Sequence, residues 1–398
     1  MLSRPFIPTS LPLSLLLLTT ALIFISTPAS PATASGARIS QQPVWAAVVL
    51  GWTTLIPLEP EALAVTILHT NDLHAHYESF GCYGEVLEGG VARLKTAIDG
   101  IREEAGNACI LLDAGDQFEG GSPYFTRGGA ARVVADVMNE MDYDAMCIGN
   151  HEFDSGPVEL AEFINLAEFP VLSANIDALS DPYLADKILP YELFFFKGER
   201  VAVIGLTTEG TAASSSPGPN VRFLDAISTA QQTVQELEEA GINKIIALTH
   251  LGYGRDLELA TSVHGIDVIV GGHSHTRLDP YPTVTSSLTG EPVLIATAYE
   301  WGKQLGRLDV TFTAEGLVKS FDGETITIDE SIAEDGDMLE LLTTSHVDDI
   351  VALPWHVVIV HKAIAVMRSE TFYAGILVGL SIAALIWFVL RIRRALRA

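Results

Sequence analysis

The chain has 398 residues, of which 48% are hydrophobic, so it can bury a full-sized core and form one main globular domain. Its formal net charge is −27, and residues 65–390 are more acidic still, because the tail 391–398 contains four arginines. Such a surface repels polyphosphate backbones, which excludes nucleic-acid binding unless cations intervene. An anionic substrate would need a local reversal of this charge.

The N-terminus has the features of a secretory signal. Arg4 precedes the apolar run 13–25, and small and proline-rich residues follow up to residue 34. This order predicts a signal peptide over residues 1–34. A second apolar run, 44–58, precedes another small-residue pattern, so processing as late as residue 64 is an open alternative.

Residues 65–330 alternate short aliphatic or β-branched runs with amphipathic stretches, as an α/β domain does. Several runs are almost continuously apolar, which is typical of internal strands buried on both faces. They predict strands at 64–68, 108–115, 144–150, 171–176, 200–206, 244–250, 267–273 and 292–298. The spacing between them predicts helices at 91–105, 131–141, 157–167 and 228–241.

The end of this domain has a different pattern. Residues 304–328 alternate apolar and polar positions around short turn sequences, which predicts antiparallel strands and hairpins, and therefore mixed sheets. Residues 210–219, with the sequence GTAASSSPGP, predict a flexible surface loop. Residues 331–371 are expected to form a stalk or a small packed appendage.

The C-terminus has the composition of a membrane anchor. Residues 372–390 are apolar and uncharged, and a helix of this length reaches roughly 28 Å, close to a ~30 Å hydrocarbon core. The basic tail 391–398 follows directly, so the positive-inside rule predicts a cytoplasmic tail and an extracellular or periplasmic domain. The alternative for 372–390 is a buried core helix.

Polar residues gather where the predicted strands end, which is where α/β folds place their ligands. These residues are Asp72, His74, Asp116, Asn150, His151, Asp154, His250, His273 and His275. In extended backbone, a spacing of two directs both side chains to one side, so each of the pairs Asp72–His74 and His273–His275 can serve one site. Asp, His and Asn without thiolate form a ligand set suited to Zn, Mn, Fe, Ni or Co.

Each motif alone has a simpler interpretation as a turn, a helix cap or a hydrogen-bonded core histidine. Five motifs in order, each ending a strand, favour a binding site, because burying so many polar groups without partners costs free energy. The other six histidines are expected to be structural.

The order of these motifs resembles the calcineurin-like metallophosphoesterases. The segments LHTNDLH, GGVARL, LLDAGDQFEG, AMCIGNHEFD and GGHSHT resemble the 5′-nucleotidase branch of that family. The resemblance implies a metallophosphoesterase domain over residues 65–330, built as a four-layer αββα sandwich of two mixed sheets. It also implies two divalent metal ions that activate a water and hold the phosphoryl oxygens for in-line displacement.

The resemblance also assigns roles to individual residues. It implies that one metal is held by Asp72, His74, Asp116 and His275, and the second by Asp116, Asn150, His250 and His273, with Asp116 bridging. It further implies that His151 stabilises the transferring phosphoryl group or protonates the leaving oxygen, and that Asp154 orients its ring. Asn150 and Arg93 are the candidate substrate contacts, and the alternative for Arg93 is an ion pair at a helix start.

The nucleotidase branch has a second, C-terminal domain that holds the nucleotide, and the residues before 372 leave no room for it here. We therefore expect weak affinity and broad substrate choice, because binding energy from the base would be lost. The first hypothesis is a membrane-anchored, outward-facing enzyme that hydrolyses phosphate monoesters such as 5′-nucleotides.

Two further hypotheses are open. One keeps the fold and changes the bond to a phosphodiester, a pyrophosphate or a sulfur ester. The other is a receptor or adhesion module with structural metals, and the presence of His151 and Asp154 argues against it. The sequence names no protein partner.

Overall fold

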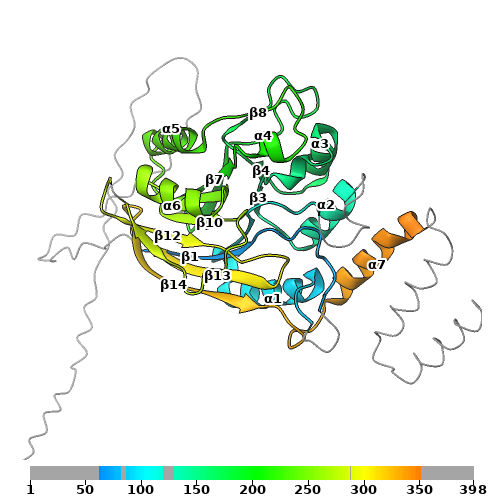
Figure 1. Cartoon of the computed structure of the whole chain (residues 1–398). Helices are drawn as coiled ribbons and strands as arrows, with labels where there is room; N and C mark the ends of the chain where they lie inside the picture. Colours follow the sequence, from blue (N-terminus) through cyan, green and yellow to red (C-terminus); the bar gives the residue numbers. More distant parts are fainter. Residues whose placement is uncertain (1–61, 82–86, 120–129, 287, 351–398) are drawn as a thin grey trace, which may run out of the picture. The chain divides into compact units, whose positions relative to one another are not determined.

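The computed structural model describes residues 62–350 apart from 82–86, 120–129 and 287, all within one compact unit of the chain (Figure 1). None of the helices within these residues is long and apolar enough to cross a membrane. The predicted signal peptide, the predicted membrane helix 372–390 and the basic tail lie outside the described residues.

Two six-stranded sheets form the centre of the domain. The first has the order β14 (Val318–Thr327), β13 (Gln304–Phe312), β1 (Leu63–Thr70), β2 (Cys109–Asp113), β3 (Ala145–Cys147) and β4 (Val171–Leu172). The second has the order β11 (Thr283–Thr285), β12 (Pro292–Ala296), β10 (Val268–Gly271), β9 (Ile245–His250), β7 (Glu199–Thr207) and β6 (Tyr191–Phe196). Both are mixed, because β13, β14, β6 and β11 pair antiparallel with their neighbours while the other strands run parallel. A two-stranded sheet joins β5 (Ile176–Asp177) and β8 (Arg222–Phe223).

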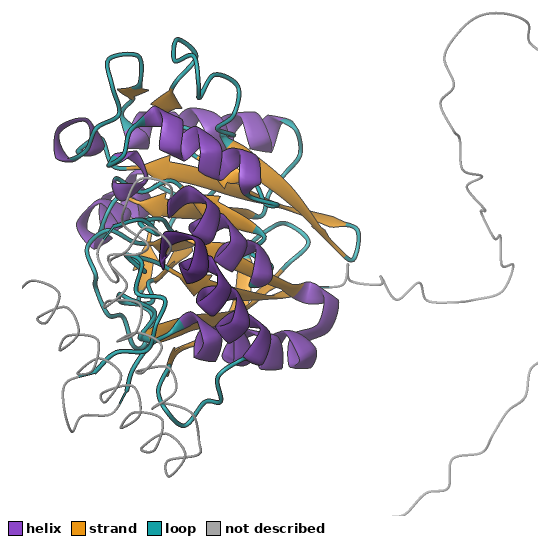
Figure 2. Cartoon of the chain, turned by 90° about the vertical axis from the view of Figure 1, so that its right-hand side faces the viewer, coloured by secondary structure: helices purple, strands orange, loops and turns teal. Residues whose placement is uncertain are grey.

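Helices cover the outer face of each large sheet. On the first sheet these are α1 (Val91–Ala105), α2 (Ala130–Glu140), α3 (Pro157–Leu166) and α7 (Gly336–Ile350). On the second they are α5 (Ala226–Glu239) and α6 (Tyr253–Ser262). Figure 2 shows helices on both sides of the strands. A third apolar cluster fills the space between the sheets, so the predicted four layers and mixed sheets are confirmed.

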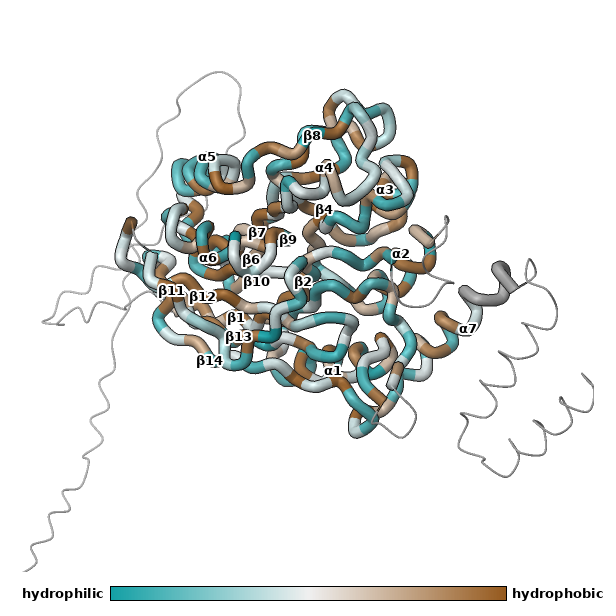
Figure 3. Tube along the Cα trace, in the orientation of Figure 1, coloured by the Kyte–Doolittle hydropathy of each residue, from teal (hydrophilic) through white to brown (hydrophobic). Residues whose placement is uncertain are grey.

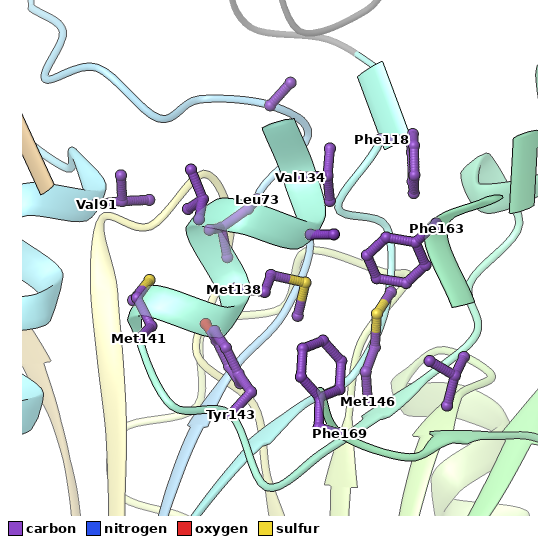
Figure 4. Close-up of a cluster of buried hydrophobic side chains, with 14 of the residues drawn as sticks. Leu73, Val91, Phe118, Val134, Met138, Met141, Tyr143, Met146, Phe163 and Phe169 are labelled. Carbon is purple, nitrogen blue, oxygen red and sulfur yellow. The ribbon is translucent and has the colours of Figure 1, made fainter. Parts of the chain in front are cut away.

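Alternation along the strands explains these layers. In β7, Val201 and Val203 face the other sheet, whereas Ala202 and Ile204 face the helix layer. Successive side chains of a strand point to opposite faces, so a strand apolar at every position needs cover on both. Figure 3 shows hydrophobic residues concentrated in these central strands. On the other side, Met138 of α2 packs with Phe163 and Phe169 against the first sheet (Figure 4).

Two expectations about individual elements need correction, and three elements were not predicted. Residues 171–176 do not form one strand: the run ends at Leu172, and Ile176 starts β5 in a different sheet. The segment 210–219 contains a short helix, α4 (Thr211–Ser214), so it is not a loop throughout. The elements β6, β11 and α6 were not predicted, because their apolar runs are short or are interrupted by polar residues.

The first part of the predicted appendage packs on the domain. Met338 and Leu342 of α7 are buried in the cluster between the helices and the first sheet. Contacts of α7 with α1 and α2 therefore attach residues 336–344 to the domain. Residues 351–371 lie outside the described residues.

His69 of β1 is a structural histidine buried inside the domain. Its Nε2 lies 3.1 Å from the hydroxyl of Tyr281. Gly306 lies opposite it on β13, and a Cβ there would come within 2.0 Å of the ring, so only glycine leaves room. Burial lowers the pKa of His69 to about 3.

This burial predicts a pH-dependent cost of folding. The unfolded chain takes up a proton on His69 below about pH 6.5 and the folded chain does not until about pH 3, so stability falls as pH decreases through this range. We expect the wild type to lose about 1.4 kcal/mol more than His69→Gln between pH 7.5 and 5.5, measured by urea unfolding with a chelator present. Equal losses in both proteins would contradict this.

Candidate functional site

The polar motifs meet at one end of the two sheets. The loop after β1 is joined to the loop after β2, because the backbone N–H of Asp72 donates to Gly115 O (2.9 Å) and that of His74 to Asp116 O (2.9 Å). The backbone N–H of His273, after β10, donates to Asp72 Oδ2 (2.9 Å). The Asp72 carboxylate, in a loop of the first sheet, therefore fixes the position of a loop of the second sheet.

The predicted ligand side chains converge in groups that can each hold a metal ion. Asp72, His74 and His275 form one group, and Asp116, His250 and His273 form another. The ligand atoms within each group lie within 4.8 Å of one another. The two groups are adjacent, because His74 Nε2 is 3.8 Å from Asp116 Oδ2. This arrangement brings together all the predicted Asp and His ligands.

The backbone at these residues differs from the expectation. Asp72, His74, Asp116, His273 and His275 all have positive φ, between 47° and 75°, and none lies in a strand. The expectation of extended backbone was therefore wrong. His273 and His275 fall into different groups, which differs from what their spacing suggests and agrees with what the family resemblance implies. Five non-glycine residues in the left-handed region store strain, which surrounding hydrogen bonds must hold in place.

The donor atoms are oriented as metal ligands need to be. His250 donates its Nδ1 hydrogen to Ala114 O (2.6 Å), which leaves the Nε2 lone pair facing Asp116 Oδ2 at 2.9 Å without hydrogen-bond geometry. Asn150 Oδ1 is buried, and no donor within the described residues reaches it. A buried acceptor and a buried lone pair without hydrogen-bond partners fit a cation between them.

The charges of the site also favour cations. Burial opposes a charge on His250, yet without a metal the Asp116 carboxylate raises the pKa of this ring to about 10, so Nε2 then holds a proton that a cation would replace. Burial likewise opposes ionisation of Asp116, yet His250 lowers its pKa below the ordinary value. The carboxylates thus attract positive charge into a buried place, and a divalent cation competes with the protons there.

His151 stands at the edge of the cluster. Its backbone N–H donates to Asp116 Oδ1 (2.8 Å), and its Nδ1 donates to Asp154 Oδ2 (2.5 Å). The hydrogen bond with Asp154 raises the pKa of His151 to about 9, so both ring nitrogens are protonated and the ring is positively charged near neutral pH. Ser215, directly after α4, donates to Asp154 Oδ1 (2.6 Å). The Asp154 carboxylate is thus fixed by a segment that follows β7 of the second sheet.

Arg93 takes the second of its predicted roles. Its guanidinium lies 3.0 Å from Glu334 Oε1 and contacts the Ser79 hydroxyl, and the residue is buried at the start of α1. The ion pair joins α1 to the segment that precedes α7. The positive charge of Arg93 is therefore paired with the Glu334 carboxylate.

Sequence reasoning missed three side chains that support the site. Glu152 accepts hydrogen bonds from the backbone of Gly149 (2.6 Å) and Gln117 (2.7 Å), Ser215 holds Asp154, and Glu300 accepts from Nδ1 of His275 (2.7 Å). Glu152 could have been found, since it is an acid inside the motif GNHEFD. Ser215 and Glu300 lie outside the motifs, so no local signal marks them.

Comparisons with known proteins agree with this geometry. The family model for the calcineurin-like phosphoesterase matches residues 65–277. The chain is 43% identical over 288 residues to the trifunctional nucleotide phosphoesterase protein YfkN of Bacillus subtilis, covering 64% of this chain and 18% of that protein. It is 39% identical over 316 residues to the 5′-nucleotidase of Rattus norvegicus, covering 74% of this chain and 54% of the relative.

Solved structures show the same relationship. The 5′-nucleotidase precursor of Thermus thermophilus superposes with a TM-score of 0.68 at 41% identity, covering 73% of this chain and 60% of that one. The NAD nucleotidase of Haemophilus influenzae gives a TM-score of 0.63 at 32% identity, covering 72% and 56%. The chain spans about half the length of the 5′-nucleotidases that it matches. Since the family model covers more than half of its residues, the chain belongs to the calcineurin-like phosphoesterase family.

Proposed function

We propose that this protein is a membrane-anchored, outward-facing phosphoesterase that uses two divalent metal ions to hydrolyse phosphate monoesters such as 5′-nucleotides. The observation that carries the proposal is the pair of adjacent ligand groups at one end of the sheets. Relatives named 5′-nucleotidase, about 40% identical over the same region, support the substrate class. The cations would also supply the local positive charge that an acidic domain needs for an anionic substrate.

Asp72, His74 and His275 would hold one metal, and His250 and His273 the other, with Asp116 shared between them. The buried Asn150 Oδ1, which no donor within the described residues reaches, would complete the second set. When bound, such ions lower the pKa of a water and neutralise phosphoryl oxygens. The chain's own part is to fix the ligands. The hydrogen bond from His250 to Ala114 O does so for one imidazole, and the left-handed loops do so for the others.

His151 would act on the substrate as a charged hydrogen-bond donor. Its Nδ1 is engaged by Asp154, so the protonated Nε2 is the atom left to stabilise a phosphoryl oxygen or to protonate the leaving oxygen. Asp154 would keep the ring oriented and protonated, and Ser215 would hold Asp154. A purely structural metal site has no use for this acid and its partners, which argues against a non-catalytic receptor.

The second candidate reaction is hydrolysis of a pyrophosphate bond. It is favoured by the 32% identity to a structure described as an NAD nucleotidase, since NAD joins its two nucleotides through pyrophosphate. The same ligand groups would serve either bond. The choice therefore depends on residues that contact the rest of the substrate.

The apolar run 372–390 and the arginines of 391–398 support the anchor and its direction. We expect the full chain, expressed in cells, to remain in alkali-washed membranes and to release phosphate from added AMP while the cells are intact. A chelator should abolish the release, and one of Zn²⁺, Mn²⁺ or Co²⁺ should restore it. Membranes that hold the protein but release neither phosphate from AMP nor a nucleoside monophosphate from NAD or UDP-glucose with any of these ions would contradict the proposal.

A further inference from the structure

A chain of contacts leads from the proposed metal ligands to a lysine outside every sequence motif. His275 donates its Nδ1 hydrogen to Glu300 Oε2 at 2.7 Å. The other carboxylate oxygen, Oε1, accepts from Lys303 Nζ at 2.8 Å. The Glu300 carboxylate is therefore held between His275 and the ammonium group of Lys303. The side chains of Glu300 and Lys303 are largely buried, with exposed fractions of 12% and 15%.

Aromatic rings hold the ammonium group on its other sides. Lys303 Nζ lies 4.1 Å from the ring centre of Trp301, 5.0 Å from that of Tyr299 and 5.7 Å from that of Phe80. The Trp301 ring is supported in turn by His76, whose ring stacks on it at 4.6 Å and 14°. Ring faces attract a cation, most strongly where water is excluded. Lys303 thus has a defined position, and it fixes that of Glu300.

The same segment is attached to the other side of the ligand group. The backbone N–H of Trp301 donates to Asp72 O at 2.8 Å, and the side-chain amide of Asn71 donates to Tyr299 O at 2.6 Å. Tyr299 and Trp301 both have positive φ, 68° and 59°, so the segment adopts a turn that these contacts maintain. Residues 299–303 therefore contact both Asp72 and His275.

We propose that Glu300, held by Lys303 and its aromatic neighbours, is a positioning residue for the metal held by Asp72, His74 and His275. The inference rests on the proposed function, because it assumes that this group binds a cation. Donation of the Nδ1 hydrogen to Glu300 leaves Nε2 of His275 as the atom within the ligand group, 3.0 Å from Nε2 of His74 and 3.4 Å from Oδ1 of Asp72. Without the carboxylate, the ring is free to rotate or to move its hydrogen to Nε2.

The effect is selective for one of the two groups. In the group of Asp116, His250 and His273, the His250 ring is oriented by the backbone oxygen of Ala114, which no substitution near residue 300 removes. Partners that orient a ligand histidine typically contribute 10- to 100-fold to metal affinity. Loss of Glu300 should therefore weaken one metal by about that factor and leave the other unchanged.

The test compares metal binding by the full chain in detergent and four variants. Glu300→Gln removes the carboxylate, Lys303→Met removes its partner, and Lys303→Arg keeps a cation over the rings. Lys95→Met is the matched control, because Lys95 forms a 2.9 Å ion pair with Asp99 on α1 at a similar exposure of 12%. Zinc and manganese binding is measured by competition with a chromophoric chelator and by metal content per chain.

We expect two ions per wild-type chain, and one of the two weakened about 10- to 100-fold in Glu300→Gln and less in Lys303→Met. Lys303→Arg and Lys95→Met should bind as the wild type does. Two unchanged affinities in Glu300→Gln would overturn the inference and leave the proposed function standing. Equal weakening of both ions would also overturn it, since it would indicate general loosening. A wild-type chain that binds neither ion would overturn both.

Discussion

Replacing Asp116 by asparagine is expected to lower phosphate release by more than about a hundredfold and to remove at least one metal ion per chain. Asp116 Oδ2 lies 2.9 Å from Nε2 of His250 and 3.8 Å from Nε2 of His74, so a single carboxylate serves both ligand groups. Asparagine keeps the shape and loses the negative charge. The rates are compared at saturating metal, and the metal content is measured after desalting.

The control for this substitution is Asp225→Asn. Asp225 caps α5 by accepting from Ser228 N at 2.8 Å, and its side chain is largely exposed. The same chemical change there should leave hydrolysis and metal content as in the wild type. If Asp116→Asn retained both metals and a tenth of the activity, a bridging role for Asp116 would be untenable.

Glu152→Ala is expected to cost at least about 3 kcal/mol of unfolding free energy, measured by urea unfolding of the metal-free protein. Glu152 is 1% exposed and accepts from the backbone N–H groups of Gly149, Asp116 and Gln117 at 2.6 to 3.0 Å. These groups belong to the loops after β2 and β3. Alanine would leave these buried donors, and the longer contact from Phe118 N at 3.4 Å, without an acceptor, and each unsatisfied donor costs about 1–3 kcal/mol.

A graded series makes this prediction specific. Glu152→Gln keeps one carbonyl oxygen and should fall between the wild type and alanine. Asp144→Ala is the comparison with a single backbone donor. Among the described residues, Asp144 Oδ2 accepts one backbone N–H, that of Leu111 at 2.7 Å, and has a 3.8 Å contact with Arg102. It should cost about 1 kcal/mol. A cost for Glu152→Ala no larger than that for Asp144→Ala would show that the two loops do not depend on this carboxylate.

Much of the fold could be predicted because burial leaves a periodic trace in the sequence. The apolar positions of β7 and β9 alternate between two neighbouring layers, so each run shows its double burial without reference to any other segment. The elements that were missed have weaker traces. The strand β6 is half exposed along most of its length, and β11 has only three residues.

The site followed from its motifs for a related reason. Parallel strands bring their carboxyl ends to one edge, so side chains such as Asp72, Asp116 and Asn150 converge once β1, β2 and β3 are adjacent. The candidate ligands could therefore be named from the sequence alone. The way in which they converge was not, because the prediction assumed extended backbone where the chain is left-handed.

The sequence by itself determined most of the strands that are buried on both faces and the polar side chains that follow them. Only the tertiary structure showed the partners that no motif names: Glu300 accepts the Nδ1 hydrogen of His275, Ser215 donates to Asp154, and Arg93 pairs with Glu334. Periodicity records whether a residue is buried, a local property. The choice of a partner depends on how distant segments approach, and a short sequence pattern carries no record of that.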